Sequence, residues 1–225
     1  MTGEHCLRFA GAAGAATILI VPPLFDEANR MRRTLVLTMR ALAALGVASA
    51  LPDLPGQNDS LVPTEEATLA GWREALRDFA VTEEPPLVVA SWRGGALIDD
   101  AVAGAAGYWR MAPVGGASLV KTMIRTRIAG EKEAGRSVDG EAVRASAAVG
   151  PVELAGNFLN AAMLAELEAA IPAEIASLRQ LAVGSGEGKL PGSALWLRAE
   201  PGEDAAMARA MAADIRDWAM TCVGR

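Results

Sequence analysis

Short apolar runs alternate along the chain with longer segments in which apolar residues recur every three or four positions. Residues 17–21 form an apolar run rich in β-branched residues that stops at Pro22-Pro23 and is typical of a central strand buried on both faces. Residues 28–45 keep helical spacing, and Gly46 stands where a left-handed C-cap is needed. A second strand is predicted at 47–51. The apolar stripe of the helix consists of Leu35, Met39, Leu42 and Leu45.

The alternation of strand and helix patterns continues toward the C-terminal end. Residues 53–60 are dense in turn formers and predict a loop, after which Thr64 is expected to cap a helix that runs to about Phe79. The remaining predicted elements are a strand at 87–90, a helix at 94–102, a strand at 108–111, strands at 179–183 and 194–198, and a helix at 204–221. This order predicts an α/β fold with a mainly parallel, doubly wound sheet. We expect residues 1–225 to form a single domain.

One long segment interrupts this alternation. Residues from about 118 to 170 show no strand pattern and contain two helical stretches around a polar, glycine-rich segment. An insertion at the C-terminal edge of a parallel sheet is normally a lid. We therefore expect a small helical lid over that edge.

Composition narrows the possible partners. The formal net charge is -6 and the pI about 5.0, so no global positive field favours nucleic acid. No run of about 18 apolar residues is present, although mean hydropathy is +0.23, and no membrane span is expected. Cys6 and Cys222 match no metal-ligand spacing, and we expect them to form no disulfide, which favours the cytoplasm. Neither a metal nor a cofactor is expected.

The turn after the third predicted strand reads Ser91-Trp92-Arg93-Gly94-Gly95. A nucleophile elbow places its central residue in a strained positive φ, with small residues two positions away on each side. Ser91 and Gly95 fit a frame centred on Arg93, and a frame centred on Trp92 is also allowed. Neither frame makes Ser91 the nucleophile.

The chain resembles the α/β-hydrolases, and more narrowly the type 2 exosortase-system-associated hydrolases found beside bacterial exopolysaccharide loci. The resemblance implies an α/β-hydrolase-like fold, a bacterial source and a link to exopolysaccharide production, and it makes an arginine at the elbow a recurrent variant. Four stretches spread in order over most of the chain carry it: residues 21–33, 53–60, 92–97 and 152–156.

A serine or cysteine nucleophile of this fold needs a histidine base from the far C-terminal end of the sheet. The only histidine is His5, which we expect on an N-terminal edge strand, away from that edge. The Ser-His-Asp triad is therefore absent, and the sequence indicates a pseudoenzyme. The acidic residues after the last two strands are expected to cap helices and carry surface charge: Glu187, Glu200, Glu203 and Asp204.

Arg93 needs a compensating negative group, because a cation opposes the positive end of the helix predicted after the elbow. A carboxylate from Asp26 or Glu27 would serve, and so would an anionic ligand held by the guanidinium and the elbow N–H groups. An equally good interpretation is that the charged side chains at 26–33 are exposed to solvent at the start of a helix and have no role at the elbow. The candidate ligand-binding residues are Leu24, Phe25, Asp26, Glu27, Asn29, Arg33, Arg93 and Gly94.

Three functions fit these features. The first is a catalytically degenerate hydrolase that binds a small anionic or acyl ligand or a protein partner. The second is an atypical ester or thioester hydrolase that activates water through Glu27 or Asp26. The third is a pure interaction module, with a possible homodimer, whose old pocket is filled by Trp92, Trp109 and lid residues.

Overall fold

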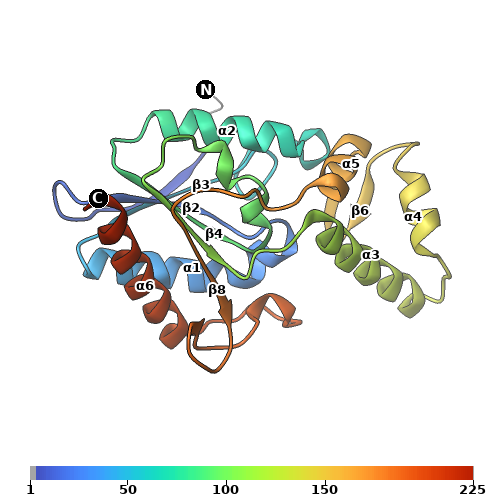
Figure 1. Cartoon of the computed structure of the whole chain (residues 1–225). Coiled ribbons are helices and arrows are strands. Elements are labelled where there is room, and N and C mark those ends of the chain that lie inside the picture. The colour runs from blue at the N-terminus through green and yellow to red at the C-terminus, as the bar shows by residue number, and fades with distance from the viewer. Residues whose placement is uncertain (1–3, 225) are drawn as a thin grey trace.

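A seven-stranded sheet forms the centre of the computed structural model, which describes residues 4–224 (Figure 1). The strand order is β1-β3-β2-β4-β5-β8-β9; β1 runs antiparallel to β3, and all other neighbouring strands are parallel. This confirms the predicted mainly parallel, doubly wound sheet. The strands are β1 (Cys6–Phe9), β2 (Thr17–Val21), β3 (Ala48–Pro52), β4 (Leu87–Trp92), β5 (Gly107–Met111), β8 (Leu178–Val183) and β9 (Lys189–Leu190).

Helices cover both faces of the sheet. Helices α1 (Asp26–Ala44) and α6 (Ala205–Val223) pack together below it, and α2 (Leu69–Val81) lies above it in Figure 1. The predicted stripe of α1 is buried at three of its four positions, whereas Leu45 is 40% exposed because the helix has ended. Gly46 takes a φ of 77°, the left-handed conformation expected there.

Two predicted helices are wrong in kind or position. Residues Thr64–Glu66 form a separate 3-10 turn, and α2 is capped by Thr68, whose side chain accepts a hydrogen bond from the Gly71 N–H at 3.0 Å. In place of a helix at 94–102, two 3-10 turns follow the elbow, because Gly94-Gly95 favour helix weakly and Ile98, with a φ of -128°, breaks the run. The turns are η2 (Arg93–Leu97) and η3 (Asp99–Ala101).

The strand predicted at 194–198 is also wrong. These residues contain a 3-10 turn, η4 (Leu195–Leu197), and the last strand is the two-residue β9. Leu195 and Trp196 are both buried. Successive side chains of a strand point to opposite faces, so a strand with one face in solvent would expose one of the two, whereas a turn can bury both.

The inserted segment, residues 116–169, is called the lid below. It contains the helices α3 (Gly116–Glu133), α4 (Gly140–Ser146) and α5 (Ala161–Ala169) and projects beyond the end of the sheet (Figure 1). The expectation of no strand here is wrong: β6 (Val152–Leu154) and β7 (Asn157–Leu159) form a hairpin. Ala155 and Gly156 connect them with φ values of 49° and 79°, as a tight two-residue hairpin turn requires.

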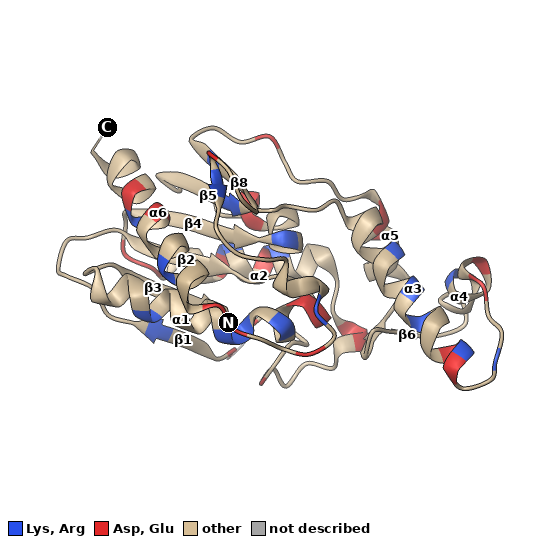
Figure 2. Cartoon of the chain, turned by 90° about the horizontal axis from the view of Figure 1, so that it is seen from below, with Lys and Arg blue, Asp and Glu red and all other residues tan. Residues whose placement is uncertain are grey.

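Basic and acidic residues, coloured blue and red on the ribbon of Figure 2, are interspersed along the helices. On the lid, Arg127 of α3 forms ion pairs with Glu131 at 2.7 Å and with Glu153 of β6 at 3.1 Å. Within residues 4–224, no helix is both long enough and apolar enough to cross a membrane.

Candidate functional site

Arg93 occupies the strained position of the turn after β4. Its φ is 54°, whereas Trp92 keeps an extended φ of -119° and ends the strand. The elbow is therefore centred on Arg93, and the alternative frame on Trp92 is excluded. The small residue two positions later is also required, because a Cβ on Gly95 would lie 2.5 Å from the carbonyl oxygen of Pro22.

A buried, bidentate ion pair joins Arg93 to Glu27. Nε and Nη2 of Arg93 each donate to one carboxylate oxygen of Glu27 at 3.0 Å. The side chain of Arg93 is 15% exposed and that of Glu27 is 6% exposed, so little solvent screens the pair. The structure thus selects Glu27 from the two predicted carboxylates. It also adds Ala112, whose carbonyl oxygen accepts from Nη1 of Arg93 at 2.9 Å.

The ring of Trp196 covers the guanidinium group of Arg93. Its centroid lies 4.5 Å from Cζ of Arg93, within the range of a cation–π contact. Arg30 holds this turn in place by donating to the Trp196 carbonyl oxygen at 2.8 Å, and Asp26 pairs with Arg30 at 3.0 Å. Asp26 therefore acts on Arg93 only indirectly, through Arg30 and Trp196.

The two carboxyl groups at the start of α1 respond strongly to burial. Burial raises the pKa of Glu27 above its ordinary value of 4.5, and the hydrogen bonds and charge of Arg93 offset part of that rise. Burial likewise raises the pKa of Asp26, against the opposing charge of Arg30. Both acids sit in the first turn of α1, where the helix dipole favours their charged forms.

These contacts leave little of Arg93 for a ligand. Three of the five N–H donors of a guanidinium group are engaged by Glu27 and Ala112, and the Trp196 ring lies over its face. Five pockets found among the described residues are lined by other side chains. An anion at Arg93 would be limited to the two remaining N–H donors unless it displaced the carboxylate of Glu27.

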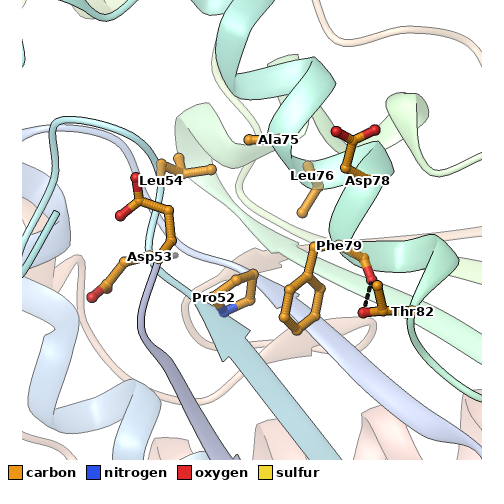
Figure 3. Close-up of a pocket in the computed structure, with 9 residues that line it drawn as sticks. Pro52, Asp53, Leu54, Ala75, Leu76, Asp78, Phe79 and Thr82 are labelled. Atoms are coloured by element: carbon orange, nitrogen blue, oxygen red, sulfur yellow. Dashed lines mark hydrogen bonds between the residues drawn. The ribbon is translucent and has the colours of Figure 1, made fainter. Parts of the chain in front are cut away.

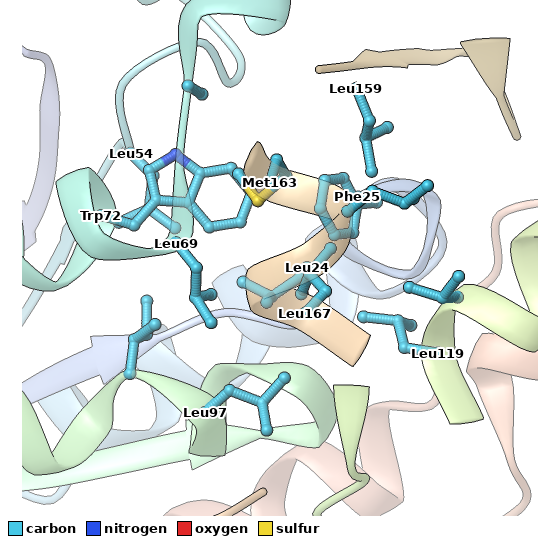
Figure 4. Close-up of a cluster of buried hydrophobic side chains, with 14 of the residues drawn as sticks. Leu24, Phe25, Leu54, Leu69, Trp72, Leu97, Leu119, Leu159, Met163 and Leu167 are labelled. Atoms are coloured by element: carbon cyan, nitrogen blue, oxygen red, sulfur yellow. The ribbon is translucent and has the colours of Figure 1, made fainter. Parts of the chain in front are cut away.

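Apolar side chains fill the space between the elbow, α2 and the lid (Figure 4). Leu24 and Phe25 extend from the end of β2 into this cluster, and the ring centroid of Phe25 lies 5.2 Å from that of Trp72. A Cβ on Gly94 would lie 3.1 Å from Leu24 and 3.2 Å from Leu119 of the lid. The members labelled in Figure 4 are Leu24, Phe25, Leu54, Leu69, Trp72, Leu97, Leu119, Leu159, Met163 and Leu167, all nearly inaccessible to solvent.

The two tryptophans expected to fill the pocket lie on the other face of the sheet. Nε1 of Trp92 approaches Sδ of Met211 at 3.3 Å, and Nε1 of Trp109 donates to Asp214 at 2.7 Å, both partners being on α6. Side chains alternate between the faces of a strand, so Trp92 and Trp109 share the α6 side.

A buried polar network behind the elbow was missed by the sequence analysis. The Ser91 hydroxyl donates to Asp99 at 2.6 Å, and Arg110 donates to the two oxygens of Asp99 at 2.8 and 2.7 Å. Arg110 and Asp99 have side chains 2% and 1% exposed. The sequence signal for this network is Arg110, a charged residue among apolar residues in a central strand.

The remaining candidates do not converge on Arg93. Asn29 is exposed on α1, and Arg33, also exposed, pairs with Glu203. The expected capping role is confirmed for Asp204, which accepts from the Met207 N–H at 2.9 Å at the start of α6.

His5 lies at an unexpected edge of the sheet. It is exposed and immediately precedes β1, as expected, but β1 is antiparallel to β3 and pairs Cys6 with Pro52. The start of β1 therefore lies beside the C-terminal end of β3, which contradicts our expectation. His5 is nevertheless three strands away from β4, at the border of the sheet.

Comparison with known proteins gives a fold and no closer relationship. No family profile and no curated protein sequence matches the chain. The ferulic-acid complex of Est1E from Butyrivibrio proteoclasticus has a TM-score of 0.54 at 16% identity, over 80% of this chain and 74% of that one. Mouse alpha/beta hydrolase domain-containing protein 10 has a TM-score of 0.52 at 14% identity, over 81% and 74%. The chain therefore has the α/β-hydrolase fold.

Proposed function

We propose that this chain is a catalytically degenerate α/β-hydrolase-fold protein that acts by binding a partner and not by hydrolysis. The observation that carries the proposal is the residue at the elbow: Arg93 holds the strained position and is locked by Glu27. A guanidinium group is neither a nucleophile nor a base at neutral pH. His5, the single histidine, immediately precedes the border strand β1, three strands away from β4.

The filled cluster supports a protein partner over a small anionic or acyl ligand. Burying the space above the elbow stabilises the lid on the sheet but leaves no room for an acyl chain there. Large apolar side chains are exposed on and next to the lid, where Phe158 is 50%, Ile171 78% and Val149 93% exposed, and others are exposed elsewhere, among them Leu61, Val81 and Leu197. We propose that this surface joins two copies of the chain or contacts another protein.

The test of degeneracy uses a fluorophosphonate probe together with a panel of ester substrates. Wild type and Arg93→Ser should both remain unlabelled and inactive, because a serine alone lacks a base. Labelling at the elbow with turnover of an ester in wild type would refute the proposal. For the lid surface, light scattering measures the oligomeric state of wild type and of Phe158→Asp. A wild-type dimer that becomes a monomer in Phe158→Asp would show that the surface joins two copies. A monomer for both proteins would favour another protein as the partner.

A second function is favoured by one observation. Burial raises the pKa of Glu27, which is the property a carboxylate needs to act as a general base near neutral pH. An atypical ester or thioester hydrolase would then activate water through Glu27. The two hydrogen bonds to Arg93 oppose this function, and any turnover abolished by Glu27→Gln would support it.

We assign the protein to a bacterial exopolysaccharide or exosortase-linked process in the cytoplasm. The support is the sequence resemblance carried by residues 21–33, 53–60, 92–97 and 152–156. A bacterial strain that lacks the gene for this protein should make less exopolysaccharide than the parent strain. Unchanged production would contradict the assignment.

A further inference from the structure

Three side chains with metal-ligating atoms converge at the border of the sheet. His5 precedes β1, Asp53 directly follows β3, and Asp59 lies in the loop after Asp53. The antiparallel pairing of β1 and β3 brings them together, and the Asp53 N–H donates to the His5 carbonyl oxygen at 2.8 Å. One imidazole nitrogen and one oxygen from each carboxylate all lie within 4.8 Å of one another.

Asp53 has a buried oxygen without a hydrogen-bond donor. Its side chain is 9% exposed, and Oδ2 lacks a partner, whereas Oδ1 accepts from Asn58 Nδ2 at 2.6 Å. A buried acceptor left without a donor is unfavourable, and more so when it is charged. Nδ1 of His5 lies 3.9 Å from Oδ2, which is beyond hydrogen-bond length. The oxygen without a donor is therefore on the side of Asp53 that lies toward His5.

We propose that His5, Asp53 and Asp59 bind a Zn²⁺ ion. One imidazole nitrogen and two carboxylate oxygens are a common three-residue zinc set, completed by water, and the imidazole disfavours Mg²⁺ and Ca²⁺, which prefer oxygen alone. Tetrahedral ligands about 2.1 Å from zinc lie about 3.4 Å apart, so the cluster must contract. His5 and Asp59 are exposed and can move toward the fixed Asp53.

The surroundings of the cluster are compatible with a cation. A pocket lined by His5, Asp53 and Asn58, among others, gives access from solvent. Arg32, the nearby cation on α1, donates to the Asn58 side-chain oxygen at 2.7 Å and thereby orients the Asn58 amide group toward Asp53. A second pocket with a different set of side chains reaches Asp53 from α2, and Figure 3 shows Asp53 and Asp78 on its opposite sides. Asp78 is thus a nearby acid outside the cluster.

The single histidine makes the test specific. Zn²⁺ titrated into the full chain should shift the imidazole proton resonances of His5 saturably, with a stoichiometry of one. Asp53→Asn and Asp59→Asn should each raise the Kd at least tenfold. Asp78→Asn, as the matched control, should leave it unchanged. His5→Asn lacks the reporter, and competition with a chromophoric chelator should show that it has lost high-affinity binding.

Other results would overturn the site. If Zn²⁺ does not move the His5 signal, the cluster does not bind the ion. If it moves the signal equally in Asp53→Asn and Asp59→Asn, the exposed imidazole holds an adventitious ion only. Should Asp53→Asn fail to fold, the exposed Asp59→Asn decides the question alone. Cys6→Ser excludes the neighbouring thiol as the true ligand if its affinity equals that of wild type. This inference does not depend on the function proposed for Arg93.

Discussion

Replacing Arg93 by methionine should strongly destabilise the protein. Methionine keeps a long apolar stem and the same strain at positive φ, so the substitution isolates the loss of the guanidinium group. Glu27, 6% exposed, would be left as an uncompensated buried carboxylate. Breaking a buried ion pair by removing one partner costs roughly 3–5 kcal/mol. The Trp196 ring also loses its cation, worth about 0.5–2 kcal/mol.

The expected fall in Tm follows from the size of the chain. A domain of 150–250 residues loses about 2–4 °C of Tm per kcal/mol, so a loss of roughly 3–5 kcal/mol should make Arg93→Met melt roughly 6–20 °C below wild type. Calorimetry at pH 7 measures this directly. The deficit should shrink at lower pH, because protonation removes the stranded charge and burial already raises the pKa of Glu27.

A double variant provides the control. Arg93→Met combined with Glu27→Leu removes both charges, and replacing a buried pair by apolar groups is often close to neutral. The double variant should therefore be more stable than Arg93→Met alone. If Arg93→Met melts within about 2 °C of wild type, or if the two substitutions are simply additive, the buried pair does not contribute as described.

Three further changes test other parts of the site. In wild type, the raised pKa of Glu27 lowers the free energy of unfolding as the pH rises above about 4.5. Glu27→Gln lacks this carboxyl group, so its free energy of unfolding should fall less, or rise more, with pH over the same range, as measured by urea unfolding. Asp99→Asn should leave Arg110 unpaired in the core and cost roughly 3–5 kcal/mol by the same assay, with any loss below 1 kcal/mol opposing a tight pair. Gly95→Ala should destabilise more than Gly94→Ala, because its Cβ would meet backbone oxygen and not movable side chains; equal melting curves would contradict the close approach.

The fold could be predicted from the sequence to a large extent, because the strongest signals are local. The run at 17–21 and the stripe of α1 report burial through residue type and spacing, and both are where the pattern predicts them. The errors lie where local preference is weak or overridden. Gly94-Gly95 favour a helix only weakly, and the elbow continues as 3-10 turns. Trp196 packs in a turn although its neighbours resemble a strand.

The site could be predicted only in part, because its contacts join distant residues. The need for a counter-charge at Arg93 follows from one residue, and the choice between Asp26 and Glu27 depends on which side of α1 faces the elbow. The Ala112 carbonyl oxygen leaves no sequence signal at all, since every residue has one. The position of His5 was misjudged because the direction of an edge strand is not visible in its residues.

The elbow keeps its strained geometry although the chemistry that normally justifies it is missing. Strain at a positive φ costs of order 1–3 kcal/mol and persists only where surrounding contacts enforce it. Here the enforcing contacts are the pair between Arg93 and Glu27, the Ala112 carbonyl oxygen and the close approach of Gly95 to β2. These contacts link the end of β4 to the start of α1, so the same turn that would expose a nucleophile in a hydrolase fixes two elements in this chain. A residue at an elbow is thus evidence about function only together with the partner that its side chain contacts.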